Sequence, residues 1–292
     1  MNYNIIKSIC KNEFSHPGGC VSDSIHDEYG IDLWDTDPNT EYVVYFCGDD
    51  CKTNLKKNLK KQPEDWYYRN HDVKYTLNSS GYRTKQFDKI NWEESIVIFG
   101  CSTIFGVGVT DEHTVPYFLE QISGRPVVNM GIPGSSNQLI THNNIILSDS
   151  KYPIPKVVIN SWTGLTRYIL YEKKSITCMG SWSKGGDKNY RPSSFETSLN
   201  LIPFNLLNVK TGRNIWKNKT IYREYCAWPS IEDVIKSIDT NFKLIDIHAN
   251  LKWNDLTDEN TRIHYARDMN HTGSIVNLRI AEILFKSIKN EL

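Results

Sequence analysis

The sequence lacks the features that would suit it to nucleic acid, to a membrane or to secretion. Its 34 Lys and Arg residues balance 34 Asp and Glu residues, so no net charge attracts it to nucleic acid or to an anionic membrane surface. No apolar run approaches the ~18 residues of a membrane span, and the N-terminus has no apolar core of the kind found in signal peptides. We therefore expect a cytoplasmic protein that binds neither nucleic acid nor membranes; its oligomeric state is left open.

Cysteine is also sparse, with seven residues in a chain of 292. An odd number of cysteines spread over this length does not suit a disulfide framework. Two histidines lie near four of the cysteines, and together they could be assembled into a zinc site: Cys10, His16, Cys20, His26, Cys47 and Cys51. Their spacing differs from the short Cys-x2-Cys pairs of structural zinc modules, so we expect scattered thiols and neither a metal nor an organic cofactor.

The pattern of the chain changes near residue 76. Residues 1–75 are irregular and polar, with one apolar run at 42–46 that predicts a strand. Residues 76–292 alternate short Val- and Ile-rich runs with helical periodicity. We therefore divide the chain into an N-terminal accessory region, 1–75, and a larger domain, 76–292.

The larger domain has the pattern of an α/β fold. Its apolar runs predict strands at 96–99, 126–130, 156–160 and 243–247. Helical stripes lie between them, one ending at Gly124, one beginning near Ser135 or Ser136, and one closing the chain at 276–288. Alternation of buried strands with helices predicts a three-layer α/β/α sandwich around a parallel sheet of about five strands. Residues 163–228 are expected to form loops and short helices over the edge of this sheet.

Two short motifs supply a candidate catalytic site. Gly100-Cys101-Ser102-Thr103 directly follows the run at 96–99, and Asp268-Met269-Asn270-His271 precedes the last helix. A serine hydroxyl becomes a nucleophile when an imidazole accepts its proton and a carboxylate orients that imidazole. Ser102, His271 and Asp268 offer this set, in loops beyond the carboxyl ends of the predicted strands.

Other interpretations of these residues compete with this one. A strand–Gly–Ser loop can also cradle phosphate, although this chain has no Gly-Lys-Ser/Thr sequence there. Cys101 could replace Ser102 as the nucleophile, but adjacent residues point in opposite directions and only one can face the base. Asp246 and His248 form a rival pair on one face of a predicted strand.

The order of the motifs resembles the SGNH, or GDSL-like, hydrolases over residues 76–292. The chain keeps the glycine and serine of the first block, with Cys101 in place of the usual aspartate. The run 129–134, Asn-Met-Gly-Ile-Pro-Gly, resembles the second block, and Asp268 and His271 match the last one. The resemblance implies an SGNH catalytic domain of flavodoxin-like architecture, with the backbone N–H groups of Ser102 and Gly134 in the oxyanion hole.

The third block of that family is missing. Its asparagine side chain contributes to the oxyanion hole, whereas here the strand at 156–160 continues into Ser-Trp-Thr-Gly-Leu-Thr-Arg. Loss of one such donor costs on the order of 10²–10³ in turnover, so a substitute is expected. We expect Asn137 to be that substitute, with Thr163 and the backbone of Gly164 as the next candidates, and we expect Trp162, Thr163 and Arg167 to contact the substrate.

The resemblance implies a serine esterase that works through an acyl-enzyme. The expected substrate is a small-molecule or carbohydrate ester, from which the enzyme removes a small acyl group such as acetyl. Two alternatives remain open: an O-acyltransferase with the same three residues, and a carbohydrate-binding module whose catalytic site has decayed.

Overall fold

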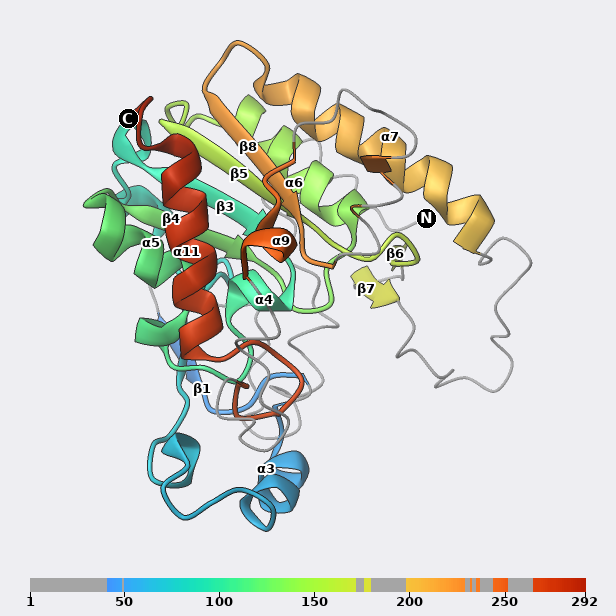
Figure 1. Cartoon of the computed structure of the whole chain (residues 1–292). Coiled ribbons are helices and arrows are strands. Elements are labelled where there is room, and N and C mark those ends of the chain that lie inside the picture. Colours follow the sequence, from blue (N-terminus) through green and yellow to red (C-terminus); the bar gives the residue numbers. More distant parts are fainter. Residues whose placement is uncertain are drawn as a thin grey trace.

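The computed structural model describes residues 41–48, 50–171, 176–179, 198–228, 232, 235–236, 244–251 and 265–292. Its centre is a parallel sheet of four strands in the order β4-β3-β5-β8 (Figure 1). These strands are β3 (Ile96–Gly100), β4 (Val127–Gly131), β5 (Val157–Trp162) and β8 (Ile221–Cys226). Every residue of β3 and β5 is buried, as the continuous Val and Ile runs predict for strands covered on both faces.

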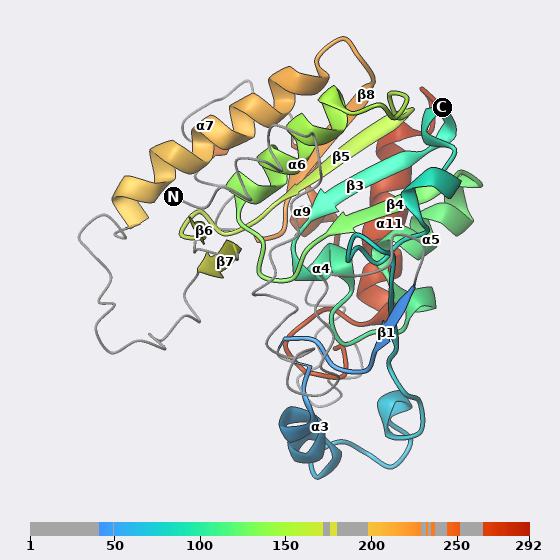
Figure 2. The ribbon, with the colours of Figure 1, turned by 180° about the vertical axis from the view of Figure 1, so that it is seen from behind.

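Helices cover the two faces of the sheet and complete three layers. One face carries α5 (Val115–Ser123), α9 (Ile247–Leu251) and α11 (Ser274–Ile288), and the other carries α6 (Asn137–Asp149) and α7 (Ser198–Trp216). Figure 1 shows α11 in front of the sheet, and the view from behind in Figure 2 shows α6 and α7 on the opposite side. The predicted three-layer α/β/α architecture is therefore confirmed.

Helix ends follow the expected capping residues. Thr114 caps α5, because its hydroxyl accepts the Tyr117 N–H, and Gly124 ends that helix in the left-handed conformation at a φ of 67°. Ser136 caps α6 by accepting the Leu139 N–H. Both predicted boundaries are confirmed, so short-range capping chemistry decides where these helices begin and end.

Two predictions for the second half of the chain are wrong. The expected fifth strand at 243–247 is not a strand in its described residues, 244–247, and α9 begins at Ile247. Among these described residues, one backbone hydrogen bond reaches the sheet, from the Ile245 N–H to the Glu224 carbonyl at 2.9 Å. Residues 163–228 were expected to form loops and short helices, but they contain the 19-residue helix α7 and the sheet strand β8.

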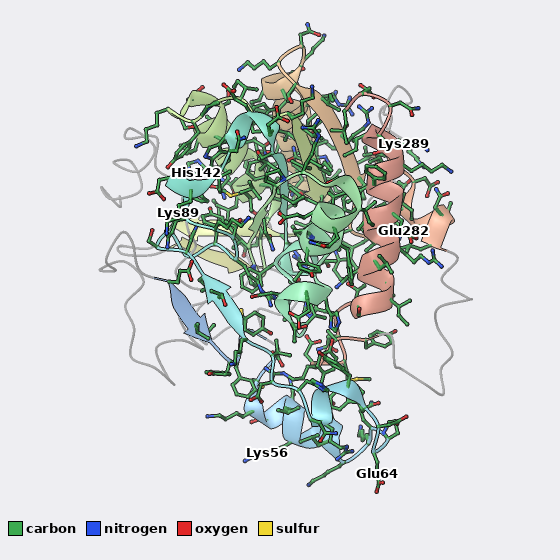
Figure 3. All side chains as sticks on the ribbon, turned by 90° about the vertical axis from the view of Figure 1, so that its left-hand side faces the viewer. Lys56, Glu64, Lys89, His142, Glu282 and Lys289 are labelled. Atoms are coloured by element: carbon green, nitrogen blue, oxygen red, sulfur yellow. The ribbon has the colours of Figure 1, made fainter. Side chains whose placement is uncertain are left out.

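The described part of the N-terminal region packs against the α/β layers. It contains β1 (Tyr42–Val44), which pairs antiparallel with β2 (Tyr75–Leu77), and α3 (Lys52–Leu59). A hydrophobic cluster joins residues of this region to Phe105, Val107, Val109 and Ala266. The boundary expected at residue 76 falls inside β2. Because the hydrophobic cluster contains residues from both sides of this boundary, the described residues on the two sides share one core. Figure 3 shows Lys56 on α3 and Glu64 pointing outward at the far end of this region.

Short elements complete the described structure. They are α4 (Ser102–Phe105), the 3₁₀ turns η1 (Tyr67–Arg69), η2 (Phe87–Lys89), η3 (Trp92–Glu94) and η4 (Asp111–His113), and the antiparallel pair β6 (Tyr168–Tyr171) and β7 (Ile176–Met179). In the described residues no helix is long and apolar enough to cross a membrane.

The cysteine and histidine set considered for zinc is only partly described. Cys10, His16, Cys20 and His26 lie outside the described residues, whereas Cys47 is buried and Cys51 is half-buried. Among the residues with described positions, no group of three or more potential ligands could hold a metal ion.

Candidate active site

Ser102 lies directly beyond the carboxyl end of β3, on the first residue of the one-turn helix α4. The chain must turn sharply there, and Gly106 ends α4 at a φ of 84°, a left-handed conformation that glycine adopts without strain. Ser102 is 7% exposed. Its hydroxyl is therefore held at the edge of the sheet with only a small part of the residue reaching solvent.

Gly131 allows α4 to lie against the end of β4. The two strands are in register so that Gly100 pairs with Gly131. A Cβ atom added at Gly131 would lie 2.3 Å from the Phe105 nitrogen, closer than real atoms approach. The helix that carries Ser102 can occupy its position because this residue has no side chain.

We expect Gly131→Ala to displace α4 and to lower the free energy of unfolding by about 1–3 kcal/mol, as overpacking does. The clash involves backbone atoms, which cannot rotate away as a side chain can. Thermal unfolding and the rate of reaction of Ser102 with a fluorophosphonate probe would measure the two effects.

Gly124→Ala is the matched control for this substitution. Gly124 has a positive φ, which Gly131 does not, but nothing lies within 4 Å of a Cβ atom added there. It stands before β4, at the opposite end of that strand from Gly131. This variant should lose stability and keep the wild-type probe reaction. Equal probe reactivity in both variants would contradict the role given to Gly131.

His271 and Asp268 lie in one loop before α11, and this loop brings both side chains to Ser102. The Ser102 hydroxyl is 2.8 Å from His271 Nε2, and His271 Nδ1 is 2.5 Å from Asp268 Oδ2. The Asp268 side chain is fully buried and that of His271 is 18% exposed. The structure thus brings together the three side chains that the two motifs single out.

The loop conformation places the carboxylate. Asp268 Oδ1 accepts the backbone N–H groups of Asn270 and His271, each at 3.1 Å, and Met269 adopts a positive φ of 63°. Because Oδ2 of a carboxylate only accepts, His271 Nδ1 carries the proton that it donates to Asp268. Nε2 is then the acceptor for the Ser102 hydroxyl, which is the arrangement a general base needs.

Gly134 lies in a tight turn that follows β4. The Ser135 N–H donates to the Ile132 carbonyl at 3.0 Å, Pro133 precedes Gly134, and Gly134 has a φ of 70°, which together define a type II turn. The Ile132 N–H donates to the Gly100 carbonyl at 3.1 Å and ties this turn to the end of β3. In the part of the chain that the structure describes, the N–H groups of Ser102 and Gly134 donate to no protein acceptor.

The Asn137 side chain, which was expected to donate to the oxyanion, is hydrogen-bonded to the chain beyond β5. Its side-chain amide donates to the Thr163 carbonyl at 3.0 Å and its Oδ1 accepts the Thr163 N–H at 2.8 Å. Asn137 is also fully buried. The amide therefore clamps the chain just beyond β5, because a backbone N–H and carbonyl that leave a strand need partners in the interior.

Trp162 and Thr163 do not face a substrate either, since both are fully buried. Trp162 is part of the core between the sheet and α7, and its Nε1 donates to Glu224 Oε2 at 2.9 Å. The Thr163 backbone is held by Asn137. The structure therefore places these two side chains, which were expected to contact the substrate, in the interior.

Arg167 is half-buried and lies close to the Gly134 turn. Its Nη1 donates to the Ser135 carbonyl at 3.2 Å, and its guanidinium lies 5.9 Å from the ring centre of the exposed Trp228. Burial raises the pKa of the Cys101 thiol, but the positive charge of Arg167 is the largest of several influences that lower it, and the pKa falls below its ordinary value. The field of Arg167 thus reaches the residue next to Ser102.

The competing interpretations find less support in the geometry. Cys101 is fully buried, as expected for the neighbour that points away from the base. His248 lies on α9, where its Nε2 is 2.9 Å from the Cys226 carbonyl, and Asp246 caps the same helix by accepting the Ala249 N–H at 2.8 Å. The expectation that Asp246 and His248 share one face of a strand is wrong.

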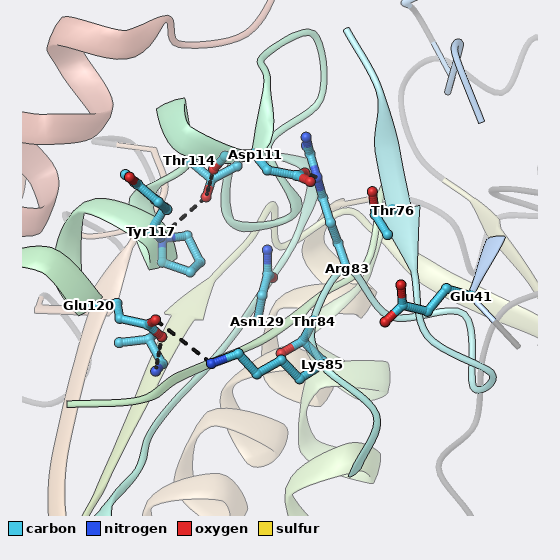
Figure 4. Close-up of a pocket in the computed structure, with 12 residues that line it drawn as sticks. Glu41, Thr76, Arg83, Thr84, Lys85, Asp111, Thr114, Tyr117, Glu120 and Asn129 are labelled. Atoms are coloured by element: carbon cyan, nitrogen blue, oxygen red, sulfur yellow. Dashed lines mark hydrogen bonds and ion pairs between the residues drawn. The ribbon is translucent and has the colours of Figure 1, made fainter. Parts of the chain in front are cut away.

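A separate cavity of about 280 Å³ lies at the outer side of the edge strand β4, and Ser102, His271 and Asp268 do not line it (Figure 4). Arg83 lines it and is held by Asp111, and its Nη1 and Nη2 donate to the carbonyls of Gly106 at 2.7 Å and Val109 at 2.9 Å. Arg83 therefore fixes the loop after α4 by hydrogen bonds to two of its carbonyl groups. Sequence reasoning missed this residue, because nothing in its spacing marks it.

Comparisons with known proteins give matches of fold only. No family profile matches the chain, and no curated protein matches it. A G-D-S-L family protein from Desulfitobacterium hafniense DCB-2 is similar at 14% identity and a TM-score of 0.39, over 65% of this chain and 99% of that one. AlinE4, an SGNH-hydrolase family esterase, has 15% identity and a TM-score of 0.35 over 70% and 96% of the two chains. A GDSL-like protein from Bacteroides ovatus ATCC 8483 has 13% identity and a TM-score of 0.34 over 68% and 53%.

Proposed function

We propose that this protein is a serine esterase of the SGNH type, with residues 76–292 as its catalytic domain. The observation that carries the proposal is the hydrogen-bonded series from Ser102 through His271 to Asp268, with distances of 2.8 and 2.5 Å. A hydroxyl, an imidazole and a buried carboxylate in this order perform acyl transfer on several unrelated folds.

In the proposed mechanism, Ser102 attacks the ester carbonyl while His271 Nε2 takes its proton. Asp268 stabilises the imidazolium that forms, and the imidazolium then returns the proton to the departing alcohol. Water, activated by the same imidazole, releases the acyl group from Ser102. The resident residues complete this cycle without a cofactor.

The N–H groups of Ser102 and Gly134 are the proposed donors to the oxyanion. The Ser102 N–H belongs to the proposed nucleophile itself, and the Gly134 turn is tied through Ile132 to the end of β3, the strand that leads to Ser102. With Asn137 bound to Thr163, no third donor is assigned. Because one donor is worth on the order of 10²–10³ in turnover, we expect a slow enzyme compared with esterases that have three.

The proposed substrate is a small-molecule ester, and a carbohydrate that carries a small acyl group such as acetyl is the favoured class. Arg167 is the remaining candidate for substrate binding, since its guanidinium lies at the Gly134 turn. A planar guanidinium suits a carboxylate or another anionic group on the alcohol part of the ester.

We expect Arg167→Met to raise KM for an anionic aryl acetate by about tenfold, the factor that one charge-assisted hydrogen bond supplies. Methionine retains much of the side-chain volume and removes the charge. KM for a neutral aryl acetate, measured on the same variant, is the control. It should change less than twofold, because a neutral substrate has no charge for the guanidinium to bind. Equal effects on the two substrates would remove Arg167 from substrate recognition.

Hydrolysis of p-nitrophenyl acetate tests the proposed function. We expect the full chain to release p-nitrophenol and to be labelled once by a fluorophosphonate at Ser102. Product analysis with an added sugar acceptor separates the two enzyme classes, since an O-acyltransferase would transfer the acetyl group to the sugar hydroxyl. Absence of both turnover and labelling would favour the binding-module alternative and overturn the proposal.

A further inference from the structure

A buried ion pair links the loop that carries Asp268 and His271 to the N-terminal region. Arg267 donates from Nε to Asp50 Oδ1 at 2.8 Å and from Nη2 to Asp50 Oδ2 at 2.7 Å. Arg267 is 2% exposed and Asp50 is 1% exposed. A two-pronged pair of this kind fixes both distance and orientation, and Arg267 directly precedes Asp268 in the chain.

Further contacts from the N-terminal region surround Arg267. The Asn58 side-chain amide donates to the Arg267 carbonyl at 3.0 Å, and Arg267 Nη2 donates to the Tyr45 carbonyl. The guanidinium also lies 4.6 Å from the centre of the Phe46 ring, within the range of a cation–π contact. The N-terminal region therefore holds both the backbone and the charged end of Arg267.

A second connection runs from Asp50 to the loop that follows Ser102. Tyr75 on β2 donates its hydroxyl proton to Asp50 Oδ2, and the Gly108 N–H donates to the Tyr75 hydroxyl at 2.8 Å. Gly108 in turn accepts the Arg267 N–H at its carbonyl, at 2.8 Å. Asp50 is thus the common partner of the loop after the nucleophile and the loop with the base.

The protonation states keep this network intact. Burial lowers the pKa of Arg267, but the hydrogen bonds and charge of Asp50 more than offset that effect and the pKa is raised. Burial, and then the negative charge of Asp50, raise the pKa of Tyr75 well above its ordinary value. Arg267 therefore stays charged and Tyr75 stays a hydrogen-bond donor under the conditions of an ester assay.

We infer that the segment 41–77 is part of the catalytic unit, and that Asp50 is a positioning residue that sets His271 and Asp268 against Ser102. The inference rests on the function proposed above. Asp50 touches no reacting atom and acts through Arg267 and Tyr75. Figures 1 and 2 show β1 and α3 of the segment 41–77 on the side of the molecule where the loop leads into α11, and the Arg267–Asp50 ion pair joins the segment to this loop.

Asp50→Asn tests the inference. We expect kcat for p-nitrophenyl acetate to fall about 10²-fold, the effect of a small misplacement of catalytic groups, with KM within about twofold. The amide retains the shape of the carboxylate but leaves the Arg267 charge without its buried partner. Tyr75→Phe is the second variant, which keeps the Arg267–Asp50 ion pair and removes the two hydrogen bonds of the Tyr75 hydroxyl, the one it donates to Asp50 and the one it accepts from Gly108. We expect it to lower kcat about tenfold.

Leu284→Ala is the matched control, because it destabilises the fold away from these loops. Leu284 is fully buried in the last turns of α11, in the cluster with β3 and β5. All variants are assayed below their melting temperatures, and rates are divided by the amount of active serine titrated with the fluorophosphonate. Wild-type kcat in both Asp50→Asn and Tyr75→Phe would overturn the inference, as would an equal loss of kcat in Leu284→Ala.

A proton NMR measurement distinguishes failure of this inference from failure of the proposed function. The Nδ1 proton that His271 shares with Asp268 should give a far-downfield resonance in the wild type and in Leu284→Ala, and this resonance should be lost or shifted in Asp50→Asn. If the wild type does not hydrolyse the ester, the proposed function fails and this resonance alone decides the positioning role. An unchanged resonance in Asp50→Asn would refute it.

Discussion

Ser102→Ala is expected to lower the turnover of p-nitrophenyl acetate by about 10⁴-fold or more. The substitution removes the atom that forms the acyl-enzyme, and the remaining His271 and Asp268 have no nucleophile to activate. Within the described residues the Ser102 hydroxyl makes one hydrogen bond, to His271, so the free energy of unfolding should change by about 1 kcal/mol at most. Initial rates and thermal melting of the purified variant measure both effects.

Ser95→Ala is the matched control for Ser102→Ala. Ser95 precedes the other end of β3, is fully buried, and donates its hydroxyl proton to the Trp92 carbonyl at 2.8 Å. The control removes the same group and one hydrogen bond from the same strand region. It should melt at a lower temperature and keep wild-type turnover per folded molecule. Wild-type turnover in Ser102→Ala would instead exclude this serine as the nucleophile.

Asp268→Asn is expected to lower kcat by about 10⁴-fold with little change in the fold. An asparagine would present its NH₂ group to His271 Nδ1, which would then have to act as an acceptor. The ring proton would move to Nε2, and Nε2 could no longer accept the proton of Ser102. Steady-state rates, with circular dichroism as the check on folding, measure this loss.

Asp246→Asn is the control for this second substitution. Asp246 also accepts a backbone N–H and lies two residues from a histidine, but it caps α9. Among the described hydrogen bonds and ion pairs, none joins it to Ser102, His271 or Asp268. It should keep wild-type kcat. If Asp246→Asn lost as much activity as Asp268→Asn, the assignment of the orienting carboxylate would be wrong.

The strands and helices that were predicted correctly are those whose local pattern and environment agree. The runs at 96–99, 126–130 and 156–160 correspond to β3, β4 and β5, which lie inside the sheet or are covered on both faces. Gly124 and Ser136 mark real helix ends because capping depends on nearest neighbours in the chain.

β8 was missed because it carries charges into the interior. Its sequence includes Arg223 and Glu224, and Glu224 is only 4% exposed. Trp162 and Arg213 both donate to the Glu224 carboxylate, and these hydrogen bonds offset the free-energy cost of removing the charge from water. Those partners come from β5 and α7, so only the folded chain shows that this polar segment is a strand.

For the site, the sequence indicated which side chains have catalytic chemistry, but it did not indicate which side chains are buried or what they bind. A short motif can report which side chains have catalytic chemistry, and the structure brings Ser102, His271 and Asp268 together across 169 residues of chain. Burial and hydrogen-bond partners cannot be read from such motifs. Asn137 was expected at the oxyanion and is found bound to Thr163, and Trp162 was expected at the substrate and is found in the core.

The sequence alone determined the fold class and the chemically competent residues, because hydrophobic periodicity, capping and side-chain type are local properties. The tertiary structure decided that Glu224 is satisfied in the interior, that Asn137 serves the chain beyond β5, and that Asp50 joins the loops around Ser102 and His271. These outcomes depend on partners up to 217 residues apart, as for Asp50 and Arg267. A buried polar group is stable only when such a partner arrives, and only folding brings it there.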